Sequence, residues 1–320
     1  MNDPVRILLH TYSLRFQFQH RPDFDIFAFI DLAASLGFDG VAISANDPDY
    51  RHLQSKSPAQ FARIRQRLEQ HQLICDLDTS GTAPDHLATL IDVAHQVGAR
   101  QLRTYTRYPY PETLTRTAAD LAQIGPVAAA AGITVMLENH ETFTGAEIAG
   151  ILAAVDHPNV KALFDYGNSQ MALEDPLVAL AAMAPYARSA HIKDHVVWPG
   201  TGRSPAEWHV LGVPLGQGYL PIAQLTQQLY AAGLRELVLE DSWGYHAPFK
   251  PERITPAALA QIGQGSFGLA QPPLANERYW FNTTALPLAW LVDEELASLQ
   301  RSWVWLQHLL TDLELPRATR

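Results

Sequence analysis

The sequence is poor in cysteine, in basic residues and in long apolar runs. A single cysteine, Cys75, excludes an intramolecular disulfide, and its apolar neighbours indicate a small buried side chain. The 23 Lys and Arg are outnumbered by 33 Asp and Glu, which gives a formal net charge of -10. Such a surface repels phosphate backbones and anionic lipids, so nucleic acid and membranes are excluded as expected partners.

No segment approaches the roughly 20 apolar residues that a membrane-spanning helix needs. The N-terminal stretch MNDPVRILLHTYSL has no basic leader followed by a small-residue cleavage site. We therefore expect a cytoplasmic protein. Hydrophobic residues make up 47% of the chain, enough for one large core, and no linker marks a boundary, so residues 1–320 are predicted to form a single domain.

Eight short runs rich in Val, Ile and Leu alternate with longer segments of helical periodicity. Most runs are apolar through their middle, which is typical of parallel strands covered on both faces. The predicted strands are 7–10, 40–44, 73–78, 101–105, 134–138, 161–165, 188–193 and 236–240. The predicted helices are 24–36, 58–71, 84–97, 112–131, 146–155, 176–183, 221–232 and 292–313.

This order of elements predicts an α/β fold, the closed (β/α)₈ TIM barrel. A doubly wound open sheet is the main alternative, but no glycine-rich dinucleotide turn follows the first strand. Residues from about 246 to 290 do not continue the alternation of strands and helices and are rich in Pro, Gly and Gln. This predicts a long insertion between strand eight and the last helix. Because it leaves strand eight at the C-terminal mouth, we interpret it as a lid or specificity loop, with a structural or dimer-forming insertion as the alternative.

Polar residues close the last four predicted strands. They are Glu138, Asp165, His191 and Glu240. Strand ends converge at one mouth of a TIM barrel, and three crowded carboxylates repel one another unless a cation compensates them. Oxygen ligands with one imidazole and no thiolate suit one divalent ion, Mn²⁺, Mg²⁺, Co²⁺ or Zn²⁺. For each carboxylate alone, a helix cap or a loop salt bridge is the alternative.

Several stretches resemble the sugar phosphate isomerase/epimerase superfamily, the xylose isomerase-like TIM barrels. The N-terminal sequences LLHTYSL and DLAASLGFDGVAI also look like the first strand, first helix and second strand of that family. Together the motifs indicate the fold and the metal site but not the substrate. The other motifs are LENH (137–140), FDYGN (164–168), HIKD (191–194), LGQGYLPI (215–222) and LVLED (237–241).

The resemblance implies that Glu138, Asp165, His191 and Glu240 bind the metal. It also implies that Glu138 and Glu240 act as a general acid/base pair on opposite faces of a small polyhydroxylated substrate. The implied function is a metal-dependent isomerase or epimerase acting on a sugar, keto-sugar or sugar acid through an enediolate. A homo-oligomer is a reasonable expectation from the same resemblance.

Two departures from the family keep a second enzyme class open. Asn168, which we expect to contact the substrate, occupies a position where many members have a histidine. Its amide can hydrogen-bond a hydroxyl but cannot transfer a proton at neutral pH. The arginine that the ketose epimerases carry after the histidine of strand seven is also absent. The alternative is a metal-dependent lyase or dehydratase acting on an oxo-sugar or a sugar-derived acid. An endonuclease of the DNA-repair branch conflicts with the acidic charge, and a non-catalytic barrel conflicts with four intact ligand positions.

Five further residues are candidates for the site. Lys193 lies two residues after His191, and we expect it to act in catalysis by polarising a carbonyl or binding a carboxylate, with a salt bridge as the alternative. We expect the other four to contact the substrate: His140 beside the metal site, Arg103 as an anchor for an anionic group, and His10 and Trp243 as sugar-facing walls. Structural ion pairing of Arg103 and simple packing of His10 and Trp243 are the alternatives.

Overall fold

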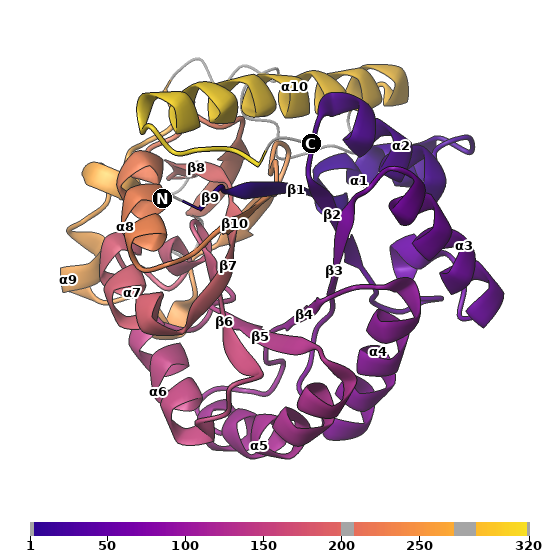
Figure 1. Ribbon diagram of the computed structural model, residues 1–320. Helices are drawn as coiled ribbons and strands as arrows, with labels where there is room; N and C mark the ends of the chain where they lie inside the picture. Colours follow the sequence, from indigo (N-terminus) through magenta and orange to yellow (C-terminus); the bar gives the residue numbers. More distant parts are fainter. Residues whose placement is uncertain (1–2, 200–207, 272–285, 319–320) are drawn as a thin grey trace.

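The computed structural model describes residues 3–199, 208–271 and 286–318. Eight parallel strands close into a barrel in the order β1-β10-β7-β6-β5-β4-β3-β2, with helices around the outside (Figure 1). The prediction of a (β/α)₈ TIM barrel is confirmed. The barrel strands are β1 (Arg6–His10), β2 (Gly40–Ser44), β3 (Ile74–Asp78), β4 (Gln101–Thr104), β5 (Thr134–Glu138), β6 (Val160–Asp165), β7 (Ala187–Ile192) and β10 (Glu236–Leu239).

The outer helices follow the predicted periodicity closely, and their ends have identifiable signals. Asp25 accepts the N–H groups of Phe27 and Ala28, both at 2.9 Å, at the start of α2. Gly37 ends the same helix with φ 83°, a conformation that costs glycine little. The helices are α2 (Ile26–Leu36), α3 (Pro58–Gln70), α4 (Pro84–Val97), α5 (Thr113–Ala131), α6 (Gly145–Val155), α7 (Pro176–Met183) and α8 (Ile222–Ala231).

The last helix, α10 (Leu288–Asp312), starts four residues before its predicted start, directly after Pro287. It lies across one side of the barrel (Figure 1) and packs on the short helix α1 (Arg15–His20). Its buried Glu295 accepts the backbone N–H groups of Phe16 at 2.8 Å and Gln17 at 2.9 Å, which satisfies the free N-terminus of α1. No described helix, α10 included, combines the length and apolar character needed to span a membrane.

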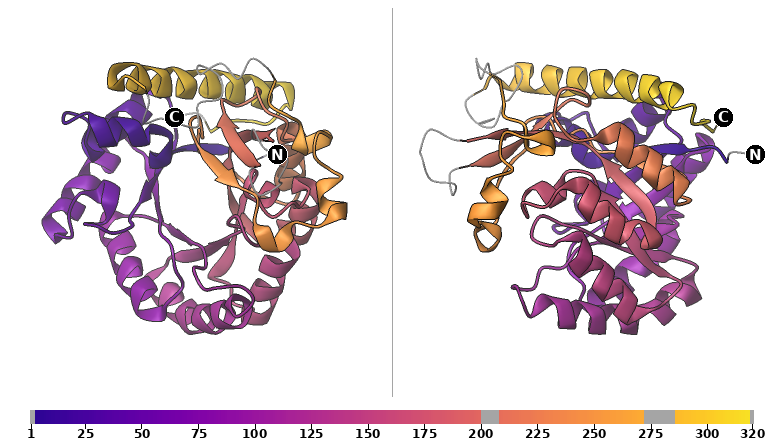
Figure 2. Two further views of the ribbon diagram at one scale, coloured as in Figure 1. Left: turned by 180° about the vertical axis from the view of Figure 1, so that it is seen from behind. Right: turned by 90° about the vertical axis from the view of Figure 1, so that its left-hand side faces the viewer.

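A second, antiparallel sheet was not predicted from the sequence. It consists of β8 (Asp194–Trp198), β9 (His209–Val213) and β11 (His246–Pro248) in the order β11-β9-β8. Figure 2 shows it projecting from the barrel at the end opposite the two termini, which is the C-terminal mouth. Because β11 belongs to the predicted 246–290 insertion, part of that insertion is a sheet edge. Residues 272–285 of the insertion lie outside the described residues.

The rest of the described insertion packs against this sheet. It forms two 3₁₀ turns, Pro251–Arg253 and Gly265–Phe267, and the short helix α9 (Pro256–Leu259). Phe249 and Phe267 are buried in one cluster with Val197 of β8. The insertion is therefore built onto the mouth of the barrel by its own small apolar core.

One buried carboxylate joins the second sheet to the barrel. Asp194, at the start of β8, accepts backbone N–H groups from His195 (2.9 Å), Gly216 (3.0 Å), Gly218 (2.8 Å) and Leu220 (3.2 Å). A side chain at position 218 would clash, because its Cβ would lie 2.1 Å from Asp194 Oδ1. The motif LGQGYL is thus a turn wrapped around one carboxylate.

We expect Asp194→Ala to lower the free energy of unfolding by roughly 3–5 kcal/mol, because several backbone N–H groups lose their buried acceptor. Urea denaturation measures the change. The exposed Asp312→Ala, at the end of α10, serves as the control and should stay within about 0.5 kcal/mol of the unmodified protein. A loss below about 1 kcal/mol for Asp194→Ala would show that water replaces the carboxylate.

Candidate metal centre

The four residues predicted to bind a metal converge at the C-terminal ends of neighbouring strands. From Nδ1 of His191, Glu240 Oε2 lies at 2.9 Å, Glu138 Oε1 at 3.1 Å and Asp165 Oδ2 at 3.7 Å. All four side chains are buried, with Glu240 the most exposed at 7%. Glu138, Asp165 and His191 form a group with ligand atoms close enough to share one ion.

The FDYGN turn after β6 orients Asp165. Its Oδ1 accepts the N–H groups of Gly167 and Asn168, both at 2.9 Å. The side chain of Asn139 brackets the Asp165 backbone, accepting its N–H at 2.7 Å and donating to its carbonyl at 3.0 Å. With Oδ1 engaged in the turn, Oδ2 is the oxygen available to the centre.

Polar atoms without hydrogen-bond partners meet at this point. Among the described residues, Glu138 Oε2, Asp165 Oδ2, His191 Nδ1 and Glu240 Oε2 are buried without a hydrogen bond, although the Lys193 ammonium lies close to Asp165 Oδ2 and Glu240 Oε2. Buried carboxylate oxygens left in this state are costly unless a cation binds them. The donor set therefore fits a divalent ion held by oxygen and imidazole nitrogen.

Lys193 supplies part of the missing positive charge. Its Nζ lies 2.7 Å from Asp165 Oδ2 and 3.1 Å from Glu240 Oε2, so the salt bridge considered from the sequence is present. Burial alone would raise the pKa of Glu240, but the charges of Lys193 and His191 outweigh it and hold that pKa well below its usual range. Burial likewise opposes a charge on His191, yet Glu240 and the carboxylates around it keep the pKa of the imidazole well above its usual range.

Asp78, at the end of β3, faces the other side of the imidazole. Its Oδ2 lies 3.4 Å from His191 Nε2, 3.4 Å from the Arg103 guanidinium and 2.5 Å from His10 Nε2. A carboxylate in this place fixes the orientation of a metal-binding histidine. His10 Nδ1 accepts the N–H of Tyr12 at 2.9 Å, so both ring nitrogens of His10 are engaged.

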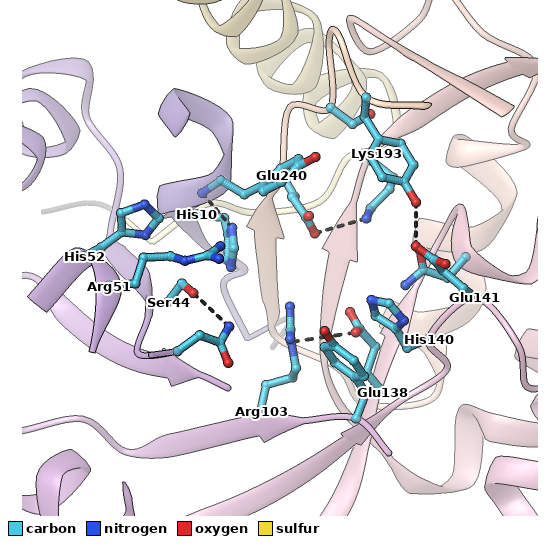
Figure 3. A pocket seen from close by; sticks show the side chains of 16 residues that line it. His10, Ser44, Arg51, His52, Arg103, Glu138, His140, Glu141, Lys193 and Glu240 are labelled. Carbon is cyan, nitrogen blue, oxygen red and sulfur yellow. Dashed lines mark hydrogen bonds and ion pairs between the residues drawn. The ribbon is translucent and has the colours of Figure 1, made fainter. Parts of the chain in front are cut away.

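A cavity of about 150 Å³ opens beside the centre at the mouth of the barrel (Figure 3). Of the four converging residues, Glu138 and Glu240 line it, whereas Asp165 and His191 do not. Lys193 lines it as well. The other lining residues are His10, Tyr12, Ser44, Asn46, Arg51, His52, Arg103, Tyr105, His140, Glu141, Asn168, Ser242 and Tyr245.

Two of the predicted substrate contacts have structural partners, and only one of the two lines the cavity. Trp243 does not line the cavity: its ring packs against Phe16 and Trp290, at 6.3 Å and 5.9 Å between centroids, because the chain turns away after Ser242. Arg103 lines the cavity, but its guanidinium donates to the Thr79 carbonyl at 3.0 Å and faces two carboxylates, so structural pairing occupies it. His10, His140 and Asn168 line the cavity, so their contact with a substrate stays a prediction.

Some lining residues were missed by the sequence analysis. Arg51 and His52 lie in the loop after β2, where no strand-end signal marks them. Glu141 directly follows the LENH motif, and Tyr245 follows LVLED by four residues, so adjacency to motifs was the available signal. Tyr245 donates to Glu141 Oε1 at 2.7 Å, which connects the segment just before the insertion to the loop after β5.

Comparison with known proteins identifies the family. Residues 30–263 match the family described as xylose isomerase-like TIM barrel, and the chain belongs to that family. It is 25% identical over 255 residues to the uncharacterized protein YihM of Escherichia coli, covering 77% of this chain and 76% of that protein. It is also 29% identical over 147 residues to a 3-oxo-isoapionate decarboxylase of Pectobacterium atrosepticum, covering 46% of this chain and 54% of the decarboxylase.

A solved structure supports the fold over most of the chain. The D-psicose 3-epimerase of Clostridium cellulolyticum H10, crystallised with D-tagatose, superposes with a TM-score of 0.61 at 14% identity. The alignment covers 93% of this chain and 98% of the epimerase. At that identity the likeness shows the barrel fold alone.

We expect Asp165→Asn to weaken binding of Mn²⁺ or Mg²⁺ by more than roughly 10-fold, because the amide keeps the turn but offers no anionic oxygen to the ion. Isothermal titration calorimetry measures the affinity. Glu141→Gln is the matched control, since Glu141 lines the cavity but pairs with Tyr245 and Lys250 instead of the centre. Equal affinities for both variants would exclude Asp165 as a ligand.

We also expect the binding of each ion to release about one proton at neutral pH, because His191 is protonated without the ion and must be neutral to ligate it. Affinity should therefore fall as the pH is lowered. Calorimetric titrations in buffers of different ionisation enthalpy count the protons. Binding without proton release would place the ion away from His191.

Proposed function

We propose that the protein is a divalent-metal-dependent isomerase or epimerase acting on a keto-sugar or sugar acid through an enediolate. The observation that carries this proposal is the division among the carboxylates. Glu138 and Glu240 line the cavity from β5 and from the end of β10, while Asp165 is enclosed. Two carboxylates facing one substrate cavity are what a reaction with proton removal and proton return requires.

Each residue has a distinct role in the proposed reaction. One of Glu138 and Glu240 removes the proton next to the substrate carbonyl, and the other returns a proton. These glutamates, with Asp165 and His191, would hold the divalent ion, which would supply Lewis-acid stabilisation of the negative charge on the substrate oxygens. Lys193 adds a positive charge beside Glu240, and Asn168 hydrogen-bonds a substrate hydroxyl without exchanging a proton.

A second candidate is a lyase that expels carbon dioxide or water from an oxo-sugar acid at the same site. Two observations favour it. The Lys193 ammonium lines the cavity, where it can bind a carboxylate or stabilise an enolate, and Asn168 offers no proton. The similarity to a decarboxylase over about half of each chain points the same way.

One experiment separates the two reactions. We expect keto-sugars or sugar acids incubated in D₂O with the Mn²⁺-loaded protein to gain solvent deuterium at the reacting carbon without loss of mass, as followed by NMR and mass spectrometry. Release of carbon dioxide or water from an oxo-sugar acid would instead assign the lyase reaction.

Variants test the roles of the two glutamates in whichever reaction is found. Glu138→Gln and Glu240→Gln should each lower kcat by roughly 100-fold or more, whereas Glu69→Gln on the exposed face of α3 should not change it. Full turnover in either cavity variant, or in rigorously metal-free protein, would contradict the proposal.

A further inference from the structure

Three cationic side chains line the cavity, and their partners differ. Lys193 contacts Asp165 and Glu240, and the Arg103 guanidinium lies between Asp78 and Glu138. Arg51 makes no side-chain hydrogen bond and no ion pair with any described residue. Because Arg51 is also solvent-exposed, it is the one of these three cations that an incoming anion can reach without displacing an ion pair of the described residues.

The loop that carries Arg51 is held in an unfavourable backbone conformation. Asp49, Tyr50 and Arg51 are consecutive non-glycine residues with φ of 50°, 53° and 41°. Left-handed backbone costs such residues roughly 1–2 kcal/mol each, so other contacts must stabilise the loop. Strained loops of this kind concentrate at ligand sites.

Contacts on both sides of Arg51 fix that conformation. Leu53 is fully buried, and the centroid of the His52 ring lies 4.3 Å from the centroid of the Phe18 ring. Lys56 Nζ pairs with Asp47 at 2.8 Å and closes the loop from outside. The result is that Arg51 reaches into the cavity from the β2 side, near His10 (Figure 3).

His52 gives an independent indication of a ligand at this end of the cavity. Its side chain lines the cavity, is only 8% exposed, and leaves Nδ1 buried without a hydrogen-bond partner in the described residues. Burial, with the charges of His10 and Arg51 nearby, lowers the pKa of His52 to about 3, so the ring is neutral. A neutral imidazole beside Arg51 suits a polar group of the ligand rather than a second cation.

The loop that carries Arg51 lies across the cavity from the metal centre. In the closed ring of eight strands, β2 is the strand opposite β6, which carries Asp165. Figure 3 accordingly shows Arg51 and His52 on one side of the cavity and Glu138, Glu141 and Lys193 on the other. A substrate with its reacting carbon at the centre would present its far end to Arg51.

We propose that Arg51 binds an anionic group, a carboxylate or a phosphate, at the end of the substrate remote from the metal centre. This inference rests on the proposed function and narrows its substrate class to sugar acids or sugar phosphates, excluding neutral sugars. An arginine guanidinium matches the oxygens of either anion with paired N–H donors.

The test is calorimetric binding of matched neutral and charged ligands to the full-length, Mn²⁺-loaded protein. The pairs are D-galactose with D-galacturonate, D-glucose with D-glucuronate, and D-fructose with D-fructose 6-phosphate. We expect at least one charged member to bind about 10-fold more tightly than its neutral partner, equivalent to about 1.4 kcal/mol. A larger advantage for the uronates identifies sugar acids, and a larger advantage for the phosphate identifies sugar phosphates.

Three variants locate the effect. Arg51→Gln should reduce the advantage to less than about 3-fold and leave the neutral sugars unchanged, whereas Arg51→Lys should retain part of it. Arg107→Gln is the matched control, because Arg107 is exposed on a neighbouring loop outside this cavity and should leave the advantage intact. The inference is overturned if no charged ligand binds more tightly, or if the advantage persists in Arg51→Gln.

The same titrations on metal-free protein separate this inference from the proposed function. An Arg51-dependent preference for anions in a protein that binds no metal would retain the inference and remove the proposed function. Metal-dependent turnover without any preference for anions would retain the proposed function and remove this inference.

Discussion

The structure depends on how the protein compensates the negative charge buried at one mouth of the barrel. Glu138, Asp165 and Glu240 converge because β5, β6 and β10 end there, and all three side chains are buried. Lys193 and His191 neutralise part of that charge, and several oxygens still have no hydrogen-bond partner among the described residues. In the proposed function a divalent ion completes the compensation, because three buried carboxylates so close together are costly without a further cation.

The second sheet and the insertion place a wall beside this centre. Asp194 ties the sheet to the barrel through backbone N–H groups, and β11 of the insertion forms the edge of that sheet. Tyr245 and Lys250 then hold Glu141, in the loop after β5, from the other side. The cavity is therefore shaped by segments distant in sequence, and substitutions in the insertion can alter it without touching the residues at the strand ends.

Much of this architecture was predictable from the sequence, for a physical reason. Parallel strands buried on both faces are apolar through their length, so the polar residue that closes each one is conspicuous: Glu138 and Asp165 are examples. The second sheet was missed because the eight barrel strands already completed the predicted fold, although DHVVW and HVLGV are as long as most of those strands. Trp243 was expected in the cavity because it follows Glu240 by three residues. Nearness in the sequence does not determine the direction of a side chain, and Trp243 does not line the cavity. Arg51 was missed because its direction is imposed by a strained loop.

The most direct test of the central claim is anomalous diffraction from crystals of the Mn²⁺-loaded protein. We expect one strong peak within bonding distance of Asp165 Oδ2, His191 Nδ1 and oxygens of Glu138 and Glu240. Lys193 would then turn from Asp165 toward the cavity. A centre without a peak at saturating Mn²⁺, with the Lys193 to Asp165 contact unchanged, would show that the lysine alone compensates these carboxylates and would contradict the account.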